Sequence, residues 1–439
     1  MSSLTSIVPL TVPALAALGF TAWILRGRKP TDFEQLLAAA PTELFRAVEV
    51  LADNARRISM LATLGLGTME RGFPRLEWWD YTETGMEVEW TLLCGQSTKT
   101  WTDPEMLDAL AHYLMVPKVL ATSPEPARIR LQVRAFDTLA APVLTPVIVP
   151  GGVDLEAAHV GMREDGLPWL LRILYAHVLL AGATGSGKGS VLWSVLNALG
   201  WAIKAGLVDV WMADPKGGAE FGRGEGRLFV RFTTDADTIL AMLREAVEVM
   251  DERLARMRAE GIRKLVPTVD EPLILIIIDE AASLSSYADR DQQQEFRRLT
   301  GLLLSKGRAA AVTVIAALQD PSKETMPNRQ LFPVRIGLRL DEPTQNAMVH
   351  GQGAKDRGAR CDEISELTPG VGYVGEDGTA EFVRVRAFMI PDYVADRIVD
   401  MYSPAPEIAG PTGDYSGFNP DDLGDEDGYD GLGEAGAAA

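Results

Sequence analysis

The sequence contains few of the residues that cross-link a protein or bind transition metals. Its 439 residues include two cysteines, Cys94 and Cys361, and four histidines. Two cysteines cannot build a disulfide framework, which indicates a reducing compartment. The histidines show no ligand spacing with one another or with cysteine, so we predict no zinc site. They are His112, His159, His177 and His350.

The sequence also lacks the basic surplus that is common in nucleic-acid-binding proteins. It has 42 lysines and arginines against 61 aspartates and glutamates, a net charge of −19. Nine acidic residues and no basic residue lie between Pro404 and Ala439, which leaves −10 for the first 403 residues. Net charge is therefore a weak argument against a nucleic-acid partner, because local basic surfaces can still exist.

One long segment near the start lacks charge altogether, the 22 residues from Leu4 to Leu25. As a helix it would span about 33 Å at ~1.5 Å per residue, enough for a bilayer core. Arg26, Arg28 and Lys29 follow it, which predicts that the rest of the chain lies in the cytoplasm. We predict a single-pass anchor in the cell membrane over residues 1–30. An apolar helix packed on the protein, or lying in the membrane interface, is the alternative.

Residues 31–150 have the pattern of a small α/β accessory domain. Alternating apolar residues predict strands with one buried face at 86–92 and 129–133. Arg128, Arg130 and Arg134 lie on the other face of the second strand. We expect these arginines to be solvated, and a basic contact surface is the alternative.

A proline-rich linker, residues 141–152, closes the accessory domain and leads into the rest of the chain. Over residues 151–403, apolar strands alternate with helices, which predicts an α/β fold with a mainly parallel sheet. Residues 404–439 are acidic, rich in glycine and poor in large aliphatic side chains. Such a tail buries too little to offset its ordering entropy, so we predict disorder. Solubility is its default role, and binding of a loading partner is the alternative.

The stretch "AGATGSGKGS", residues 181–190, has the pattern of a phosphate-binding loop. An apolar strand precedes it, and an apolar helical face follows it. Its glycines let backbone N–H groups turn toward a phosphate, and the helix start adds about half a positive charge. Lys188 is placed to reach the β and γ phosphates of ATP. The predicted nucleotide-binding residues are Gly182, Ala183, Thr184, Gly185, Ser186, Gly187, Lys188, Gly189 and Ser190.

The loop departs from the usual pattern at one position. A serine or threonine that ligates Mg²⁺ normally follows the lysine, but here Gly189 follows it. The hydroxyl comes one residue later, at Ser190, a shift that rotates it by about 100° around a helix. Ser190 is our predicted Mg²⁺ ligand, with Thr184 as the alternative.

A second signature lies at 273–284, "LILIIIDEAASL". Six consecutive apolar residues predict a central strand that is buried on both faces. Its end should lie at the edge of the sheet where open α/β sheets bind ligands. Asp279 suits coordination of Mg²⁺, and Glu280 suits deprotonation of an attacking water, a role worth ~10²–10⁴-fold. An ordinary strand ending in surface acids is the alternative if this signature is taken by itself.

Three more segments place polar residues at this edge. "VWMADPKG" carries Asp214 and Lys216, and "VTVIAALQDPS" carries Gln319. Gln319 could sense the γ-phosphate or orient water, or simply cap its strand. Arg308, in "SKGRAA", is expected near the edge, where it could complete the site of a neighbouring subunit. Its alternative role is that of a cation at a helix C-terminus.

Together these segments resemble the FtsK/SpoIIIE family of DNA-pumping ATPases, in particular its shorter actinobacterial conjugative-element and actinophage members. The resemblance covers about Gly161 to Tyr373 and includes "DPKGGAEF", "IIIDEAASL" and "IGLRLDEPTQNAMVHGQGA" in order. Glycine after the loop lysine looks like a trait of that group. The resemblance implies a hexameric ring of RecA-like P-loop NTPase motors that uses ATP and Mg²⁺ to drive double-stranded DNA through its centre.

The resemblance also implies two DNA-facing loops. Lys323 and Arg329 match the basic residues of the first loop. The second loop maps near "LDEPTQ", where Asp341 and Glu342 are acidic, which weakens the case for a DNA contact there. We therefore predict a membrane-tethered DNA translocase that serves a mobile element or a phage. Protein export of the type VII kind, coupling to a relaxase and a nucleotide-binding scaffold are the alternatives.

Overall fold

The computed structural model describes residues 32–146, 153–322, 325–379 and 381–404. The predicted membrane anchor, Lys323 and all but the first residue of the acidic tail lie outside these ranges. Within them, no helix has the length and apolar character that a bilayer crossing requires.

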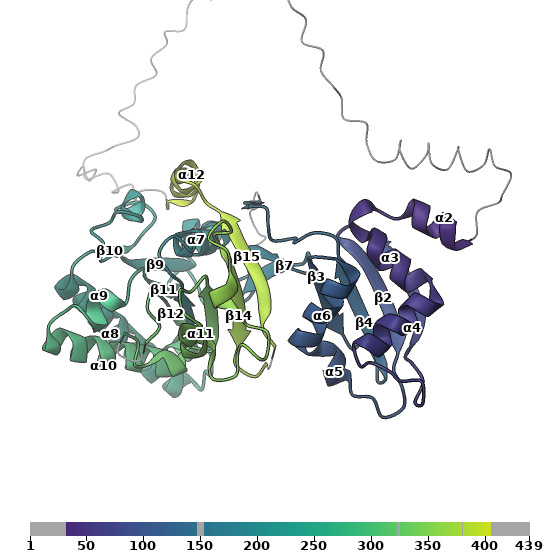
Figure 1. Ribbon diagram of the computed structural model, residues 1–439. Helices are drawn as coiled ribbons and strands as arrows, with labels where there is room; N and C mark the ends of the chain where they lie inside the picture. Colours follow the sequence, from purple (N-terminus) through teal and green to yellow (C-terminus); the bar gives the residue numbers. More distant parts are fainter. Residues whose placement is uncertain (1–31, 147–152, 323–324, 380, 405–439) are drawn as a thin grey trace, which may run out of the picture. The chain divides into compact units, whose positions relative to one another are not determined.

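The N-terminal described region is built on a four-stranded antiparallel sheet with the strand order β1-β2-β4-β3 (Figure 1). The expected alternation is confirmed, because the apolar residues of β2 and β4 are buried in one core. The strands are β1 Arg75–Thr82, β2 Gly85–Thr91, β3 Lys118–Thr122 and β4 Arg128–Arg134. The helices are α2 Asp32–Ala39, η1 Thr42–Leu44, α3 Phe45–Ala52, α4 Asn54–Thr63, α5 Thr98–Thr102 and α6 Pro104–Leu114.

The expectation that the arginines of β4 are solvated is wrong for Arg134, whereas the side chains of Arg128 and Arg130 are 40% and 37% exposed. Arg128 and Arg130 make ion pairs of 2.5 and 2.9 Å with Glu89 of the neighbouring strand β2, and Glu89 is buried. Arg134 is itself buried and donates a hydrogen bond to Gln132 at 2.8 Å. A cross-strand carboxylate therefore pairs with Arg128 and Arg130, because a buried carboxylate requires a cation beside it.

The larger sheet has eleven strands and a second, separate core. Its order is β10-β9-β11-β12-β8-β13-β14-β15-β6-β7, and β5 pairs with β15. The pairs from β10 to β13 are parallel, and those from β13 to β7 are antiparallel, so the sheet is mixed. The six parallel strands are β8 Val178–Ala181, β9 Val208–Ala213, β10 Arg231–Thr233, β11 Leu273–Ile278, β12 Val312–Leu318 and β13 Val334–Leu338.

The antiparallel half brings together distant parts of the chain. Strand β15 lies between β14 and β6, so a strand near residue 386 pairs with one near residue 162. Part of the predicted linker is also ordered, since β5 pairs in parallel with β15. These strands are β5 Val143–Leu144, β6 Ala158–Arg163, β7 Pro168–Leu171, β14 Val371–Glu376 and β15 Val383–Met389.

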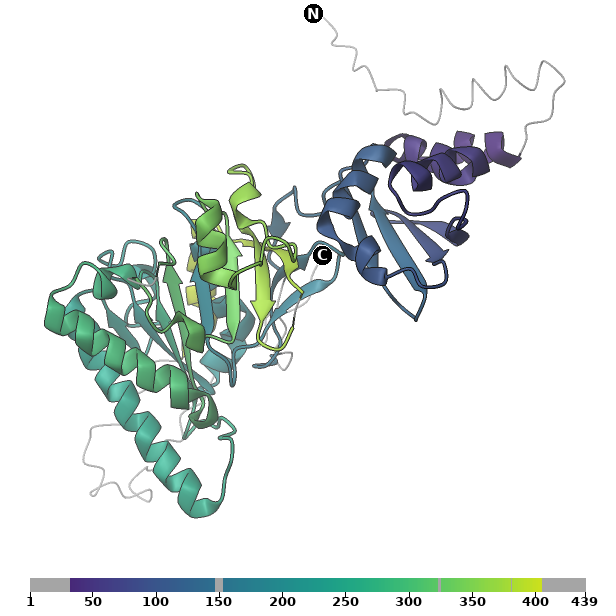
Figure 2. The ribbon, with the colours of Figure 1, turned by 60° about the horizontal axis from the view of Figure 1, so that its bottom comes forward.

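Helices cover both faces of this sheet. The connection through α7, from β8 to β9, runs in one direction along the strand order, and the connections through α8 and α10 run in the other. Because such crossovers are right-handed, α7 lies on one face of the sheet and α8 and α10 lie on the other. Helix α7 packs against α12, whereas α8 and α10 lie side by side (Figure 2). The helices are α7 Lys188–Lys204, η2 Gly222–Gly224, α8 Ala236–Glu260, α9 Ala282–Ser285, α10 Arg290–Lys306, η3 Gly307–Ala310, η4 Arg329–Leu331, α11 Pro343–His350, η5 Cys361–Glu363 and α12 Asp392–Tyr402.

Burial explains why the parallel half was recognisable from the sequence. Every residue of β8, β11 and β12 is buried, as expected for strands covered by helices on both faces. Because these strands are parallel neighbours, their carboxyl ends meet at one edge of the sheet. The predicted loop and the predicted carboxylates follow directly from those ends.

Candidate functional site

The loop between β8 and α7 requires glycine at several positions. Gly185 and Gly187 have φ values of 74° and 97°, which only glycine adopts readily. A Cβ at Gly187 would also lie 2.4 Å from the backbone nitrogen of Gly370. That nitrogen donates a 2.8 Å hydrogen bond to the carbonyl of Ser186, so a segment of distant sequence buttresses the loop.

Lys188 begins α7 and is held inside the loop. Its side chain is buried, and Nζ donates to the carbonyl oxygens of Gly182 at 2.6 Å and Ala183 at 3.2 Å. An ammonium group has three N–H donors, so one remains for a further acceptor. Burial lowers the pKa of Lys188, and the charges of Glu280 and Asp279 oppose that shift. The cation and both carboxylates therefore share one site, as the sequence predicts.

The two carboxylates after β11 are buried and only partly satisfied. Asp279 is 1% exposed; its Oδ2 accepts a 2.6 Å hydrogen bond from Lys216 Nζ, and its Oδ1 has no partner in the described part of the chain. Glu280 is 6% exposed; Oε1 accepts from the N–H of Ala282 at 3.4 Å, and Oε2 has no partner within the same ranges. Burial raises the pKa of Glu280, with Lys188 and Lys216 opposing. Buried oxygens without partners are costly, and they indicate a site built for a ligand.

The loop after β9 contributes a third group of polar residues. Asp214 is fully buried and accepts hydrogen bonds from the backbone N–H groups of Lys216, Glu220 and Phe221 at 3.1, 3.3 and 3.1 Å. Asp214 thus shapes the loop that carries Lys216 toward Asp279. The sequence placed Asp214 and Lys216 at this edge but gave no role to Glu220.

Gln319, at the end of β12, contacts the phosphate-binding loop. Its Oε1 accepts a 3.0 Å hydrogen bond from the hydroxyl of Thr184. Arg339, which follows β13, donates to the carbonyl of Thr184 at 2.8 Å and was not identified from the sequence. Residues at the ends of two strands, β12 and β13, therefore contact the loop that follows β8.

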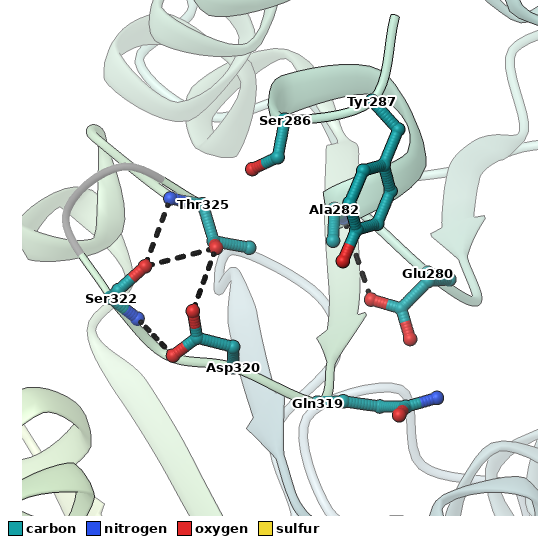
Figure 3. Close-up of a pocket in the computed structure, with 8 residues that line it drawn as sticks. All are labelled: Glu280, Ala282, Ser286, Tyr287, Gln319, Asp320, Ser322 and Thr325. Carbon is teal, nitrogen blue, oxygen red and sulfur yellow. Dashed lines mark hydrogen bonds between the residues drawn. The ribbon is translucent and has the colours of Figure 1, made fainter.

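A pocket of about 460 Å³ lies beside this convergence (Figure 3). Glu280 and Gln319 line it together with the segment that follows β12. Asp320 holds that segment, since it accepts from the N–H of Ser322 at 3.1 Å and from the hydroxyl of Thr325 at 3.3 Å. Glu280 lines this pocket, which leaves room for a water molecule beside its carboxylate.

The expectation that Arg308 lies near this edge is wrong for a single chain. Arg308 lies in η3, immediately before β12, and is exposed. Gln319 lies beyond the other end of the same strand, roughly 20 Å away at ~3.3 Å per residue. The reason is that α10 runs back along the sheet, so its C-terminus meets the amino end of the next strand. Arg308 instead lies near His177, and burial, helped by the Arg308 charge, lowers the pKa of that histidine to about 3.

Of the two predicted DNA-contact residues, the structure describes one. Lys323 lies outside the described residues. Arg329 lies in η4 and is half-buried, and its Nη1 has no hydrogen-bond partner among the described residues.

A Mg²⁺ site at this edge of the sheet would include oxygens of the bound nucleotide. Within the described residues, no group of three or more His, Cys, Asp or Glu side chains could hold a metal ion alone. A Mg²⁺ ion bound with ATP takes several of its ligands from phosphate oxygens and water, so fewer protein ligands are needed. The unpartnered Oδ1 of Asp279 fits this requirement. Ser190 is half-buried at the start of α7, and its role as a ligand stays a prediction.

Comparisons with known proteins agree with this site. Residues 152–271 match the FtsK/SpoIIIE family. The DNA translocase FtsK of Corynebacterium efficiens is 26% identical over 255 residues, which are 52% of this chain and 26% of that protein. The DNA translocase SftA of Bacillus subtilis is 26% identical over 257 residues, 55% of this chain and 26% of that protein. This chain thus spans about a quarter of the length of the curated relatives it matches.

A solved structure shares the fold. The conjugation coupling protein TcpA of pCW3, solved as a monomer with ATPγS, aligns with a TM-score of 0.51 and 20% identity. The alignment covers 79% of this chain and 98% of that one. The family match includes the phosphate-binding loop and the loop after β9, so this part of the chain is similar to proteins of the FtsK/SpoIIIE family.

Proposed function

We propose that this protein hydrolyses ATP and uses the energy to move double-stranded DNA, as a ring of six copies that serves a mobile element or a phage. One observation carries the proposal: Lys188, Asp279 and Glu280 share one edge of the sheet, each buried, and two carboxylate oxygens have no hydrogen-bond partner among the described residues. The family domain supports the proposal, as do the relatives described as DNA translocases.

Each residue has a distinct part in hydrolysis. The remaining N–H of Lys188 and the backbone N–H groups at the start of α7 bind the β and γ phosphates. Glu280 accepts a proton from the attacking water, and the positive charges of Lys188 and Lys216 help to keep its carboxyl ionised. Asp279 would hold Mg²⁺, with Ser190 as the second ligand that the sequence suggests, and the ion would supply positive charge to the phosphates.

Gln319 offers a route from the nucleotide to DNA. Its side chain contacts Thr184 in the loop, and its backbone continues into the hydrogen-bonded segment that begins at Asp320. That segment leads to Lys323 and Arg329, the proposed DNA contacts. A change at the γ-phosphate that breaks the Thr184–Gln319 bond would therefore reach the DNA-facing segment directly.

The test is ATP hydrolysis by the full chain and by Lys188→Ala and Glu280→Ala, with duplex DNA, single strands or no polymer. We expect duplex DNA to stimulate the wild type, and the stimulation to fade steeply with salt because phosphate contacts release counterions. Lys188→Ala should lose turnover. Glu280→Ala should bind ATP but hydrolyse it at least ~10²-fold more slowly.

The same assay separates the alternatives. Stimulation only by a polypeptide would support protein export, and stimulation only by single strands would support relaxase coupling. ATP hydrolysis that no polymer stimulates would support a nucleotide-binding scaffold. Normal hydrolysis by Glu280→Ala would remove that residue as the base.

We also propose that residues 1–30 anchor the protein in the cell membrane, with the motor in the cytoplasm, and that the acidic tail binds a loading partner. The support is the uncharged run from Leu4 to Leu25 and the basic residues after it. Flotation with liposomes of the full chain and of a chain without residues 1–30 tests the anchor. Equal flotation of both would contradict it.

A further inference from the structure

The position that breaks the loop pattern is already occupied by another side chain. A Cβ built on Gly189 would lie 1.4 Å from Oε1 and 2.6 Å from Cδ of Glu220. The Glu220 carboxylate therefore fills the volume in which a serine or threonine at position 189 would place its hydroxyl. An oxygen is present where the usual pattern has one, but it comes from a residue 31 positions away in the sequence.

The loop after β9 is built to hold Glu220 there. The buried Asp214 accepts the backbone N–H groups of Glu220 and Phe221. The Phe221 ring is fully buried and stacks on Trp193 of α7, with 5.2 Å between ring centroids. Because Phe221 packs on the helix that begins with Lys188, Glu220 is fixed against the first turn of that helix.

The Glu220 carboxylate faces a site in which the carboxylates outnumber the cations. Across the described part of the chain, no hydrogen bond or ion pair to its side chain is formed. Within the described ranges, Oδ1 of Asp279 and Oε2 of Glu280 are buried without partners, and the charge of Asp279 acts on Glu220. Burial and the charges of Asp279 and Asp214 raise the pKa of Glu220, while Lys216 and Lys188 oppose them. Two lysines do not neutralise this set of carboxylates, and a divalent cation would.

We propose that Glu220 supplies the oxygen ligand to the ATP-bound divalent cation that a serine or threonine after the loop lysine supplies in the usual pattern. The proposal rests on the proposed ATPase function. It gives Glu220 the part that the sequence suggested for Ser190, and it explains how a loop with Gly189 can still hold a metal–nucleotide pair.

The experiment measures metal binding without turnover. Mn²⁺ is titrated into the full chain with ATPγS, and bound Mn²⁺ is followed by electron paramagnetic resonance. ATPγS binding in EDTA is measured in parallel. We expect Glu220→Ala and Glu220→Gln to weaken Mn²⁺ binding about tenfold or more, as loss of a residue at a metal site typically does. Nucleotide binding in EDTA should persist. Glu225→Ala, an exposed carboxylate on the same loop, is the matched control, and circular dichroism checks the fold.

A rescue variant distinguishes ligation from packing. In Gly189→Ser/Glu220→Ala the serine hydroxyl enters the volume that the carboxylate leaves, so most of the lost Mn²⁺ affinity should return. Wild-type Mn²⁺ affinity in Glu220→Ala, no recovery in the double variant, or a loss seen in Ser190→Ala instead would overturn the proposal. If the wild type binds no nucleotide even in EDTA, the proposed function itself fails.

Discussion

Two carboxylates of the site, Asp279 and Glu280, lower the stability of the nucleotide-free protein and are suited to bind a ligand. Among the described residues, Oδ1 of Asp279 and Oε2 of Glu280 are buried without hydrogen-bond partners, and each such group typically costs about 1–3 kcal/mol. Within the same ranges, Glu280 accepts one long hydrogen bond, from Ala282, although it is 6% exposed. Such a cost is tolerated when the same atoms contact a ligand.

The first prediction concerns Glu280→Gln in the nucleotide-free protein. Burial raises the pKa of Glu280, so above that pKa the charged carboxylate lowers stability, and below the unfolded-state pKa it does not. The variant should therefore melt a few degrees higher than the wild type at pH 8, since ~1 kcal/mol moves Tm by about 2–4 °C in a domain of this size. The gain should vanish as the pH falls toward 4.

Thermal melts at both pH values check this, with Glu225→Gln as the exposed control. A variant that melts at or below the wild type at pH 8 would show that the Glu280 charge is well solvated.

A residue of the site could be predicted from the sequence only where a short motif around it marks its position. Lys188, Asp279 and Glu280 follow directly from strand ends, so short patterns located them. Glu220 could not be assigned, because its position depends on how Asp214 and Phe221 fold a loop. The signal was indirect: a glycine stood where a hydroxyl was expected, and nothing in the pattern said which side chain replaces it.

At the scale of elements, the site is a junction between strand ends. The loop after β8 is bonded to β12 through Gln319, and Gly182 N–H donates to the carbonyl of Leu318. On its other side, Gly370 supports the carbonyl of Ser186. The loop is therefore held by two segments outside itself, the end of β12 and the residues around Gly370.

The second prediction compares two glycines of this loop. Gly187→Ala and Gly185→Ala both place a side chain at positive φ, which costs ~1–2 kcal/mol. Only at Gly187 would the new Cβ also meet the backbone of Gly370, at 2.4 Å, whereas Gly185 has open space. Chemical denaturation of the nucleotide-free protein should show a clearly larger loss for Gly187→Ala. Equal losses would mean that the contact with Gly370 is loose.

The parallel half of the sheet was predictable, and the antiparallel half was not. Strands covered on both faces are continuous apolar runs, as in β11, and such runs stand out in the sequence. Strands such as β15, with the sequence VRVRAFM, carry polar residues, and no local feature names β14 and β6 as their partners. The same limit explains Arg308, whose position follows from the direction of α10 and not from its neighbours in sequence.

At the scale of the whole molecule, the exposed Arg308 lies too far from its own Glu280 to serve it. In a ring, the amino edge of one sheet can face the carboxyl edge of the next, which would bring Arg308 to a neighbour's nucleotide. This arrangement is the proposed hexamer, and it gives Arg308 a role only between copies.

The third prediction tests that role by mixing inactive variants. Arg308→Ala should lower DNA-stimulated hydrolysis by up to ~10³-fold, as for other arginines supplied in trans. Mixed with Lys188→Ala, it should regain activity, because some interfaces then pair an intact loop with an intact arginine. Full activity of Arg308→Ala alone, or no recovery on mixing, would assign this residue to the helix terminus.

The position of β15 has a consequence for synthesis of the protein. Because β15 lies between β14 and β6, the sheet stays split until about residue 389 has left the ribosome. Ser186 also lacks its contact from Gly370 until that residue has been synthesised. A growing chain therefore completes the support of its phosphate-binding loop only late in synthesis.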